Sequence, residues 1–204
     1  MHTAALFGCC SACKGLLEAG CRPNDQDEDG PTALILAAED GYDSIVNLLL
    51  AAGASVKIVS STGVRALSIA AGNGHAEAVR LLLSHGADKN FVMEERVPML
   101  LTAIYRGHRD VVNLPIESGI NLESRWKSWT PLYLAAVGDD ITTVNEWLEK
   151  DVDIHCPGPD GMTILHHAIR HGRHELINHL LDMGFDVNAC MKPQMPDNWR
   201  FRLD

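Results

Sequence analysis

Histidines near the C-terminal end of the chain are the residues most suited to chemistry. His174-Glu175 is followed by His179, a spacing close to that of a helix that binds zinc through two histidines. Such a helix needs its histidines four residues apart, so that both rings face one metal ion from adjacent turns. Here they stand five apart and diverge by more than about 100° around the helix axis. We therefore interpret them as part of a solvated helix face.

His167 and His171, just before this segment, do have the four-residue spacing of a metal-binding pair. No cysteine or carboxylate stands at ligand spacing to complete a site, so no metal site is predicted. The sequence also contains no glycine-rich phosphate loop, no nucleophile elbow and no paired catalytic carboxylates. We therefore predict no catalytic residues and no cofactor.

The cysteines crowd one end of the chain. Cys10-x-x-Cys13 has the spacing of half a metal site, and the full set is Cys9, Cys10, Cys13, Cys21, Cys156 and Cys190. This uneven distribution argues against a disulfide framework and against a metal site. We therefore predict that the cysteines are reduced and that the protein is located in the cytoplasm or nucleus.

Composition narrows the choice of partners. Apolar residues make up 46% of the 204 residues, enough for a substantial core, and the formal net charge is −10. That charge would repel a phosphate backbone or an anionic membrane, so we expect neither nucleic acid nor a membrane as partner. No apolar run approaches the roughly 20 residues of a membrane-spanning helix. Residues 4–17 are mostly apolar, but the basic residues that precede an export signal are missing.

An internal repeat supplies the elements that must position any functional residue. Glycine recurs every 33 residues at Gly8, Gly41, Gly74 and Gly107, and the series continues through Asp139 and Gly172. A pair of small or aliphatic residues precedes each of these first markers. A second marker follows each first one after twelve residues and is preceded by an apolar pair; the series is Gly20, Gly53, Gly86, Gly119, Asp151 and Gly184. Six aligned copies indicate six equivalent structural repeats.

Each repeat has the pattern of two short helices. Thr32, Thr130 and Thr163 stand where a hydroxyl can cap the first free amides of a helix. The first marker glycine ends that helix, because glycine adopts the left-handed conformation without a Cβ clash. A second helix follows with apolar residues at helical spacing. No repeat can bury its apolar face alone, so the repeats must stack around one continuous core.

Several segments resemble the ankyrin repeat, and they do so in register. They are Thr130-Pro131-Leu132-Tyr133 and Thr163-Ile164-Leu165-His166 (its T-P-L-H box), Gly74-His75 and Gly107-His108 (its glycine-histidine turn), and Gly86-Ala87-Asp88-Lys89-Asn90 (its closing segment). The resemblance implies an all-α solenoid of stacked helix-turn-helix repeats with β-hairpin fingers. It also implies a structural hydrogen-bonding role for His166.

On this pattern the ankyrin-repeat domain spans residues 1–190, in repeats of about 1–24, 25–57, 58–90, 91–123, 124–155 and 156–190. The first repeat lacks its opening turn and is expected to cap the stack, which explains the apolar N-terminus without an export signal. Residues 191–204 form a tail. We expect this tail to cover the last repeat, or else to begin a region that continues beyond the chain.

Some repeats depart from the pattern. Arg65 and Pro98 replace the capping threonine in the third and fourth repeats. Pro115 lies inside the second helix of the fourth repeat, where its missing amide is expected to kink or shorten that helix. The fifth repeat is one residue short and has aspartate at both markers, so we expect the least regular stacking around the fourth and fifth repeats. Cys13 and Cys21 align with core positions of other repeats and are predicted to be buried.

The resemblance also implies where a partner would bind. Ankyrin repeats usually contact a partner through the hairpin tips and the exposed side of the first helices, which line a concave groove. Exposed Trp, Tyr and Arg dominate binding hot spots, so we expect Trp126 and Trp129 to contact a partner. The alternative for Trp129 is that it packs against the next finger. Carried over by position, the predicted partner-binding residues are Glu28, Asp29, Glu39, Asp40, Tyr105, Arg106, Trp126, Lys127, Trp129, Met162, Arg170 and His171.

The predicted function is that of a protein-protein interaction module, a scaffold or adaptor that recognises a protein partner in its groove. Two alternatives stay open. One is a small-molecule or catalytic site in the groove of repeats four to six, between Tyr105, Trp129 and His171. The other is that the chain is the repeat portion of a longer multidomain protein. An open aromatic patch favours a protein partner, and a closed apolar pocket favours a small molecule.

Overall fold

The computed structural model describes residues 1–28, 30–88, 99–117, 129–138, 140–149, 157–158 and 161–185. Within these residues it contains twelve helices in six consecutive pairs, and each predicted repeat contains one pair. The pairs are α1 (His2–Leu6) with α2 (Cys10–Glu18), α3 (Ala33–Glu39) with α4 (Asp43–Ala51), α5 (Ala66–Gly72) with α6 (Ala76–Ser84), α7 (Met99–Tyr105) with α8 (Arg109–Glu117), α9 (Pro131–Val137) with α10 (Ile141–Leu148), and α11 (Ile164–Arg170) with α12 (His174–Asp182).

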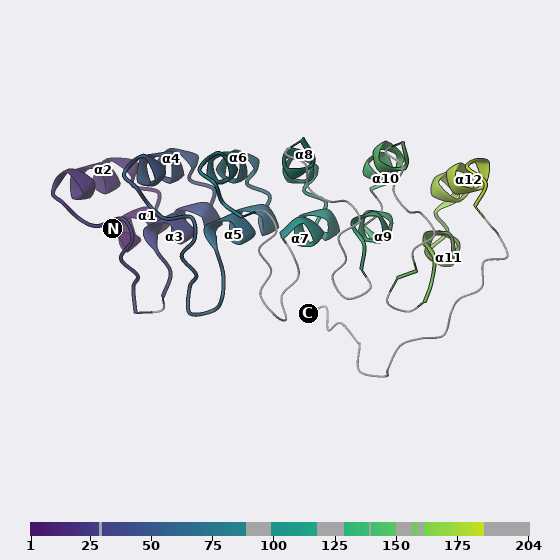
Figure 1. The fold of residues 1–204 in the computed structure, drawn as a ribbon, viewed down its shortest axis with the longest axis horizontal. Coiled ribbons are helices and arrows are strands. Elements are labelled where there is room, and N and C mark those ends of the chain that lie inside the picture. The colour runs from purple at the N-terminus through teal and green to yellow at the C-terminus, as the bar shows by residue number, and fades with distance from the viewer. Residues whose placement is uncertain are drawn as a thin grey trace. The chain divides into compact units, whose positions relative to one another are not determined.

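The helices belong to two compact blocks, an N-terminal block of residues Met1–Ile120 and a C-terminal block of residues Asn121–Asp204. In the N-terminal block the first helices α1, α3, α5 and α7 pack side by side in chain order, and the second helices α2, α4, α6 and α8 form another layer (Figure 1). In the C-terminal block α9 packs against α11, and each of them packs against its own second helix. The predicted tail, residues 191–204, lies outside the described residues.

None of the helices in the described part of the chain combines the length and the apolar character needed to span a membrane.

Small and branched apolar side chains fill the core. Ala37 and Ala38 on α3 are fully buried, and their lack of bulk lets neighbouring helices approach closely. Leu49 and Leu82 occupy equivalent positions on α4 and α6 and are fully buried too, a burial that stabilises by about 1.5–3 kcal/mol per side chain. The fifth repeat has Trp147 at that position, also fully buried.

One of the two cysteine predictions is wrong. Cys13 is fully buried, as predicted, and burial together with the nearby Cys10 raises the pKa of its thiol. Cys21 is exposed. Its equivalents Ala54 and Ala87 are buried, and they belong to repeats that have a neighbour on either side. The first repeat packs against one neighbour in the described structure, and the side chain of Cys21 therefore stays in contact with solvent.

Three first helices begin with the predicted threonine cap. The Oγ1 atoms of Thr32 and Thr130 accept hydrogen bonds from the N–H three residues further on, at 3.3 and 3.1 Å. Thr163 forms a capping box with His166, whose Nδ1 lies 2.8 Å from the threonine Oγ1. The predicted structural role of His166 is thereby confirmed. Arg65 occupies the same place in α5 without a side-chain capping bond.

The fingers of the second and third repeats, which the structure describes, are hairpin turns. In the second repeat Gln26 and Thr32 form an isolated antiparallel bridge, and in the third the N–H of Ser60 donates to the carbonyl of Val64 at 2.9 Å. The amide of Gln26 also donates to the carbonyl of Val59 at 3.0 Å. This last bond joins two neighbouring fingers.

The first marker glycines have two structural roles. Gly41 and Gly74 have φ values of 70° and 82°, in the left-handed region that favours glycine. Each also lies against a histidine ring of the next repeat. A Cβ on Gly41 would overlap the ring of His75, and a Cβ on Gly74 would lie 2.7 Å from Nδ1 of His108. The glycine therefore ends its own helix and leaves room for the histidine ring of the neighbouring repeat.

Pro115 does not shorten α8, so this part of the prediction is wrong. The helix runs from Arg109 to Glu117, the same nine residues in length as α4 and α6. The fixed φ of proline, about −65°, is itself helical, and the lost hydrogen bond falls in the last turn. The fifth repeat departs differently, because α10 has eight residues. The carboxylate of Asp140 caps this helix by accepting a hydrogen bond from the N–H of Thr143 at 3.1 Å.

The two roles of Gly41 can be separated by comparison with Gly53. Gly53 also has positive φ, at 85°, but a Cβ there would meet nothing within 4 Å. We expect Gly53→Ala to cost the backbone strain of about 1–2 kcal/mol. Gly41→Ala should cost clearly more, because its methyl group also collides with His75. Urea unfolding of both variants measures the difference, and equal losses would mean that the histidine ring moves aside without cost.

Replacement of Pro115 should stabilise the protein. Pro115→Ala restores an amide donor in α8, where proline is about 3 kcal/mol less favourable than alanine in a helix interior. Pro115→Leu should gain at least as much, because leucine fills this position in α4 and α6. Thermal unfolding followed by circular dichroism tests both variants. A lower midpoint for the pair would show that the stack requires a bend at the proline.

Candidate partner-binding surface

The ends of the first helices form an exposed row across the N-terminal block. Each repeat contributes the last residue of its first helix and the residue after it, just before the marker glycine. We call these eight residues the helix-end row. All but Gly72 are exposed, and α1, α3, α5 and α7 carry them side by side. The row consists of Leu6, Phe7, Glu39, Asp40, Gly72, Asn73, Tyr105 and Arg106.

Paired hydrogen bonds hold neighbouring members of this row together. The carbonyl of Glu39 accepts from Nδ2 of Asn73 at 2.8 Å and from Nε2 of His75 at 2.9 Å. One repeat further on, the carbonyl of Gly72 accepts from Nη1 of Arg106 at 2.7 Å and from Nε2 of His108 at 3.0 Å. Each carbonyl has two lone pairs, and both are used. The backbone beneath the row is therefore fixed.

The sequence pattern did not reveal the structural role of these clamping residues. Arg106 was predicted as a partner-binding residue, and its guanidinium spans to the preceding repeat, where Nη1 also lies 3.3 Å from Oδ1 of Asn73. The available signal was the spacing: Asn73 and Arg106 stand at equivalent positions, each two residues before a histidine. A binding role for Arg106 stays a prediction.

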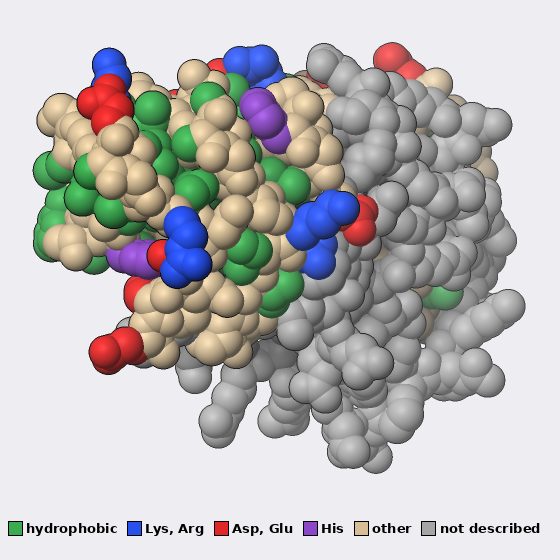
Figure 2. Space-filling model, turned by 60° about the vertical axis from the view of Figure 1, so that its left-hand side comes forward, with side chains coloured by type: hydrophobic (Ala, Val, Ile, Leu, Met, Phe, Trp, Pro, Cys, Tyr) green, Lys and Arg blue, Asp and Glu red, His purple; other side chains and the backbone are tan. Residues whose placement is uncertain are grey.

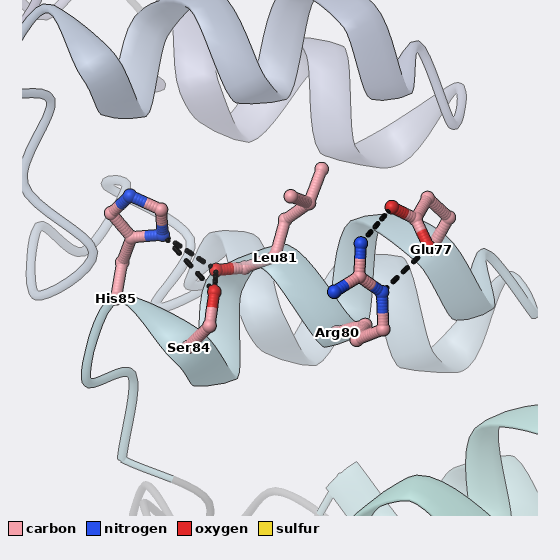
Figure 3. A network of polar contacts seen from close by, with 5 residues as sticks. All are labelled: Glu77, Arg80, Leu81, Ser84 and His85. Carbon is pink, nitrogen blue, oxygen red and sulfur yellow. Dashed lines mark hydrogen bonds and ion pairs between the residues drawn. The ribbon is translucent and has the colours of Figure 1, made fainter.

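Exposed carboxylates mark the second repeat. Glu28 in the finger and Glu39 and Asp40 in the helix-end row are exposed, and no ion pair involves them within the described residues. By contrast, Glu77 on α6 accepts hydrogen bonds from Arg80, which lower the pKa of its carboxyl group (Figure 3). The fourth acidic residue predicted here, Asp29, lies outside the described residues.

An apolar surface lies next to these carboxylates. Leu6 and Phe7 are 43% and 69% exposed, the latter more than any other large apolar side chain in the described structure. Tyr105, at the equivalent position on α7, is 43% exposed. Figure 2, in which the N-terminal block comes forward, shows hydrophobic side chains gathered at the N-terminal end of the molecule. The helix-end row thus changes from apolar to acidic between α1 and α3.

The C-terminal block contains a chain of aromatic contacts. Trp129 meets Tyr133 edge-on at 5.5 Å between ring centroids, Tyr133 lies 5.8 Å from His167, and His167 lies 4.4 Å from His171. Tyr133 is buried, because its ring packs against Gly158, where a Cβ would overlap it. Trp129 is half-buried. Its packing on Tyr133 anchors one side of the ring, and the other predicted role, contact with a partner, stays a prediction.

The remaining predicted binding residues are only partly described. Arg170 and His171 are exposed at the end of α11, and Nη1 of Arg170 lies 4.0 Å from the sulfur of the half-buried Met162. Trp126 and Lys127 lie outside the described residues. The predicted binding roles of Trp126 and Lys127 therefore stay predictions.

The chemical alternatives gain no support from these positions. Within the described residues, no three His, Cys, Asp or Glu side chains come together as metal ligands. The small-molecule alternative joined Tyr105 of the N-terminal block with Trp129 and His171 of the C-terminal block. It stays a prediction without an observation that favours it.

Comparison with known proteins agrees with the repeat architecture. The family model for ankyrin repeats (three copies) matches residues 1–93 and 99–190. The human ASB11 ankyrin repeat domain is 29% identical and superposes with a TM-score of 0.81, covering 92% of this chain and 84% of that one. The ankyrin repeat domain of Bcl-3, a member of the IkappaB protein family, is 24% identical, with a TM-score of 0.74 and coverage of 91% and 86%. No curated protein matches in sequence.

The family match spans nearly all of the chain and includes both described blocks. It agrees with the threonine caps, the left-handed marker glycines and the two helix layers, each of which the structure shows independently. The chain is therefore a member of the ankyrin-repeat family, whose domains are in general protein-interaction modules.

Proposed function

We propose that the chain binds a protein partner along the helix-end row and the adjoining fingers. One observation carries this proposal: the repeats share residue types at buried core positions and differ in residue type at the exposed positions of the row. Ala37 and Ala38 recur as Ala70 and Ala71, and all four are fully buried. The pairs at the helix ends beside them share no common type; in chain order the four pairs are Leu-Phe, Glu-Asp, Gly-Asn and Tyr-Arg.

This contrast has a physical reason. A buried position must keep its volume, because core packing tolerates little change. An exposed position at a helix end can change its residue type without altering the core volume. Asn73 and Arg106 bond to the preceding repeat, and the other exposed side chains of the row are available for recognition. The exposed members of the row thus differ in chemistry from one repeat to the next along one fixed backbone. A rigid surface of this kind loses little conformational entropy when it binds.

Two fingers add candidate contact residues, one in each block. Glu28 is exposed in the finger of the second repeat. In the finger of the fifth repeat, the described residues begin at Trp129, whose ring packs edge-on against the buried Tyr133. Tryptophan, tyrosine and arginine are the residue types that contribute most to binding hot spots. We therefore propose Trp126 and Trp129 as a separate contact site on the C-terminal block, of the kind that a scaffold or adaptor uses.

We propose the cytoplasm or nucleus as the location of this module. The four cysteines in the described part of the chain, Cys9, Cys10, Cys13 and Cys21, are free thiols. Free thiols persist in reducing compartments, which supports the proposed setting.

A displayed random-peptide library tests the proposed function, because the selection needs no candidate partner. Peptides selected on the wild-type chain should bind a Glu39→Ala, Asp40→Ala, Tyr105→Ala variant at least about 10-fold more weakly, because these side chains supply the contacts. The matched control replaces Asn47 and Ser84 with alanine, exposed residues of α4 and α6 outside the row, and should bind normally. Equal binding by both variants would place the interaction surface elsewhere.

The two tryptophans of the fifth finger should behave differently. Trp126→Ala should weaken a complex made through this fingertip by about 2 kcal/mol or more, the usual threshold for a hot spot, with little change in stability. Trp129→Ala should also lower the unfolding midpoint, because it removes an edge-to-face contact with Tyr133 worth about 0.5–1.5 kcal/mol. Calorimetric binding and thermal unfolding measure the two effects. A Trp126 variant that unfolds, while its folded fraction binds normally, would make that tryptophan structural.

A further inference from the structure

Two carboxylates stand at the end of α3 where a helix disfavours them. Glu39 is the last residue of α3 and Asp40 is its C-cap. The C-terminal end of a helix carries partial negative charge, which favours cations and disfavours carboxylates. The corresponding ends of α7 and α11 carry Arg106 and Arg170, whose charge has the favourable sign. The pair on α3 therefore lowers the stability of the free protein.

Nothing in the described part of the chain offsets these two charges. Neither carboxylate forms an ion pair or a side-chain hydrogen bond there, whereas Glu77 on α6 pairs with Arg80 one turn away (Figure 3). The bonds from Asn73 and His75 to the Glu39 carbonyl fix the backbone beneath the pair. The backbone that carries the two carboxylates is thus fixed, and no cation pairs with them within the described residues. A local violation of this kind is typical of functional positions.

The apolar pair lies at the equivalent place on the neighbouring helix. Leu6 and Phe7 end α1 as Glu39 and Asp40 end α3, and the two helices pack against each other. The ring of Tyr42, the residue after Gly41, lies against Gly8 of the first repeat, just as the ring of His75 lies against Gly41. One repeat spacing therefore separates an exposed apolar site from an exposed acidic site.

The repeat spacing selects the conformation of a segment that would contact both sites. Packed helices lie about 8–10 Å apart. A polyproline II segment rises about 3.1 Å per residue with three residues per turn, so every third side chain returns to the same face after about 9 Å. A β-strand returns to the same face after two residues, about 6.8 Å. The helix-end row therefore matches a polyproline II segment that contributes one side chain to each repeat.

We propose that the helix-end row binds an extended partner segment in the polyproline II conformation. The segment places a leucine-sized or aromatic side chain on Leu6 and Phe7, and an arginine or lysine three residues away on Glu39 and Asp40. The cation forms charge-assisted hydrogen bonds with the carboxylates and cancels the unfavourable charge at the end of α3. Binding thereby removes the electrostatic destabilisation that the two carboxylates cause in the free protein. This proposal rests on the proposed function and specifies the chemistry of its partner.

Synthetic fluorescein-labelled peptides test the proposed partner chemistry by fluorescence anisotropy on the full chain. The probes contain Leu-Pro-Ala-Arg and, for the opposite chain direction, Arg-Pro-Ala-Leu. Their controls carry Glu in place of Arg, or place Leu next to Arg. We expect one of the two probes to bind at least about 10-fold more tightly than both of its controls, and its affinity to fall as salt rises, because screening weakens the charge pairing.

Variants of the chain separate a recognition role from a structural one. Glu39→Gln with Asp40→Asn should weaken binding of the basic peptide about 10-fold and raise the unfolding temperature by roughly 2 °C, because the charges that recognise the partner also destabilise α3. Glu39→Lys with Asp40→Lys should reverse the preference toward the acidic peptide. The control Glu77→Gln, on an exposed acid outside the row, should leave peptide binding unchanged.

The outcomes distinguish this inference from the proposed function. Equal binding of acidic and basic peptides, or a loss of stability in the Gln and Asn variant, overturns the inference. If the library-selected peptides still require the helix-end row, the proposed function stands and the partner chemistry alone is wrong. If those peptides ignore the row, the proposed function fails as well.

Discussion

In the N-terminal block, the second and third repeats are each joined to the next repeat through a backbone carbonyl at the end of a first helix. The carbonyls of Glu39 and Gly72 each accept two side-chain hydrogen bonds from the following repeat, and a histidine that provides one of them lies against a marker glycine. A short helix pair cannot bury its apolar face alone. These contacts lie where neighbouring first helices pack against each other and complete a shared core, and the helix-end row lies directly over them.

The repeat spacing gives the exposed surface its regularity. Because the backbone beneath the row is fixed, each repeat presents its own side chains at a constant distance from those of its neighbours. Asn73 and Arg106 use their side chains to join repeats, whereas the second repeat has two carboxylates that a helix end disfavours. Glu39 and Asp40 stand at the negative end of α3 without an ion pair in the described structure. A cost in stability at an exposed, rigidly held position is the trade between stability and function that binding surfaces commonly show.

The sequence by itself determined the repeat and most of its local structure. The threonine caps, the left-handed glycines, the alanine pairs and the role of His166 were predictable because each depends on residues a few positions apart. The number and order of the helix pairs followed from the 33-residue period. The helix-end row could also be located by position, since every member precedes a marker glycine. The burial of its members and their hydrogen-bond partners within the fold could not be predicted from the sequence.

Only the tertiary structure decided which of these residues are shared between repeats. Asn73, His75 and Arg106 reach about 33 residues back along the chain, and no local pattern contains that contact. Cys21 aligns with buried alanines yet is exposed, because burial depends on how many neighbours a repeat has. The length of α8 was misjudged for a related reason, since a helix packed on both its own partner and the preceding second helix keeps its form despite Pro115. Sequence period fixes what a repeat is, whereas packing between repeats fixes what each of its side chains touches.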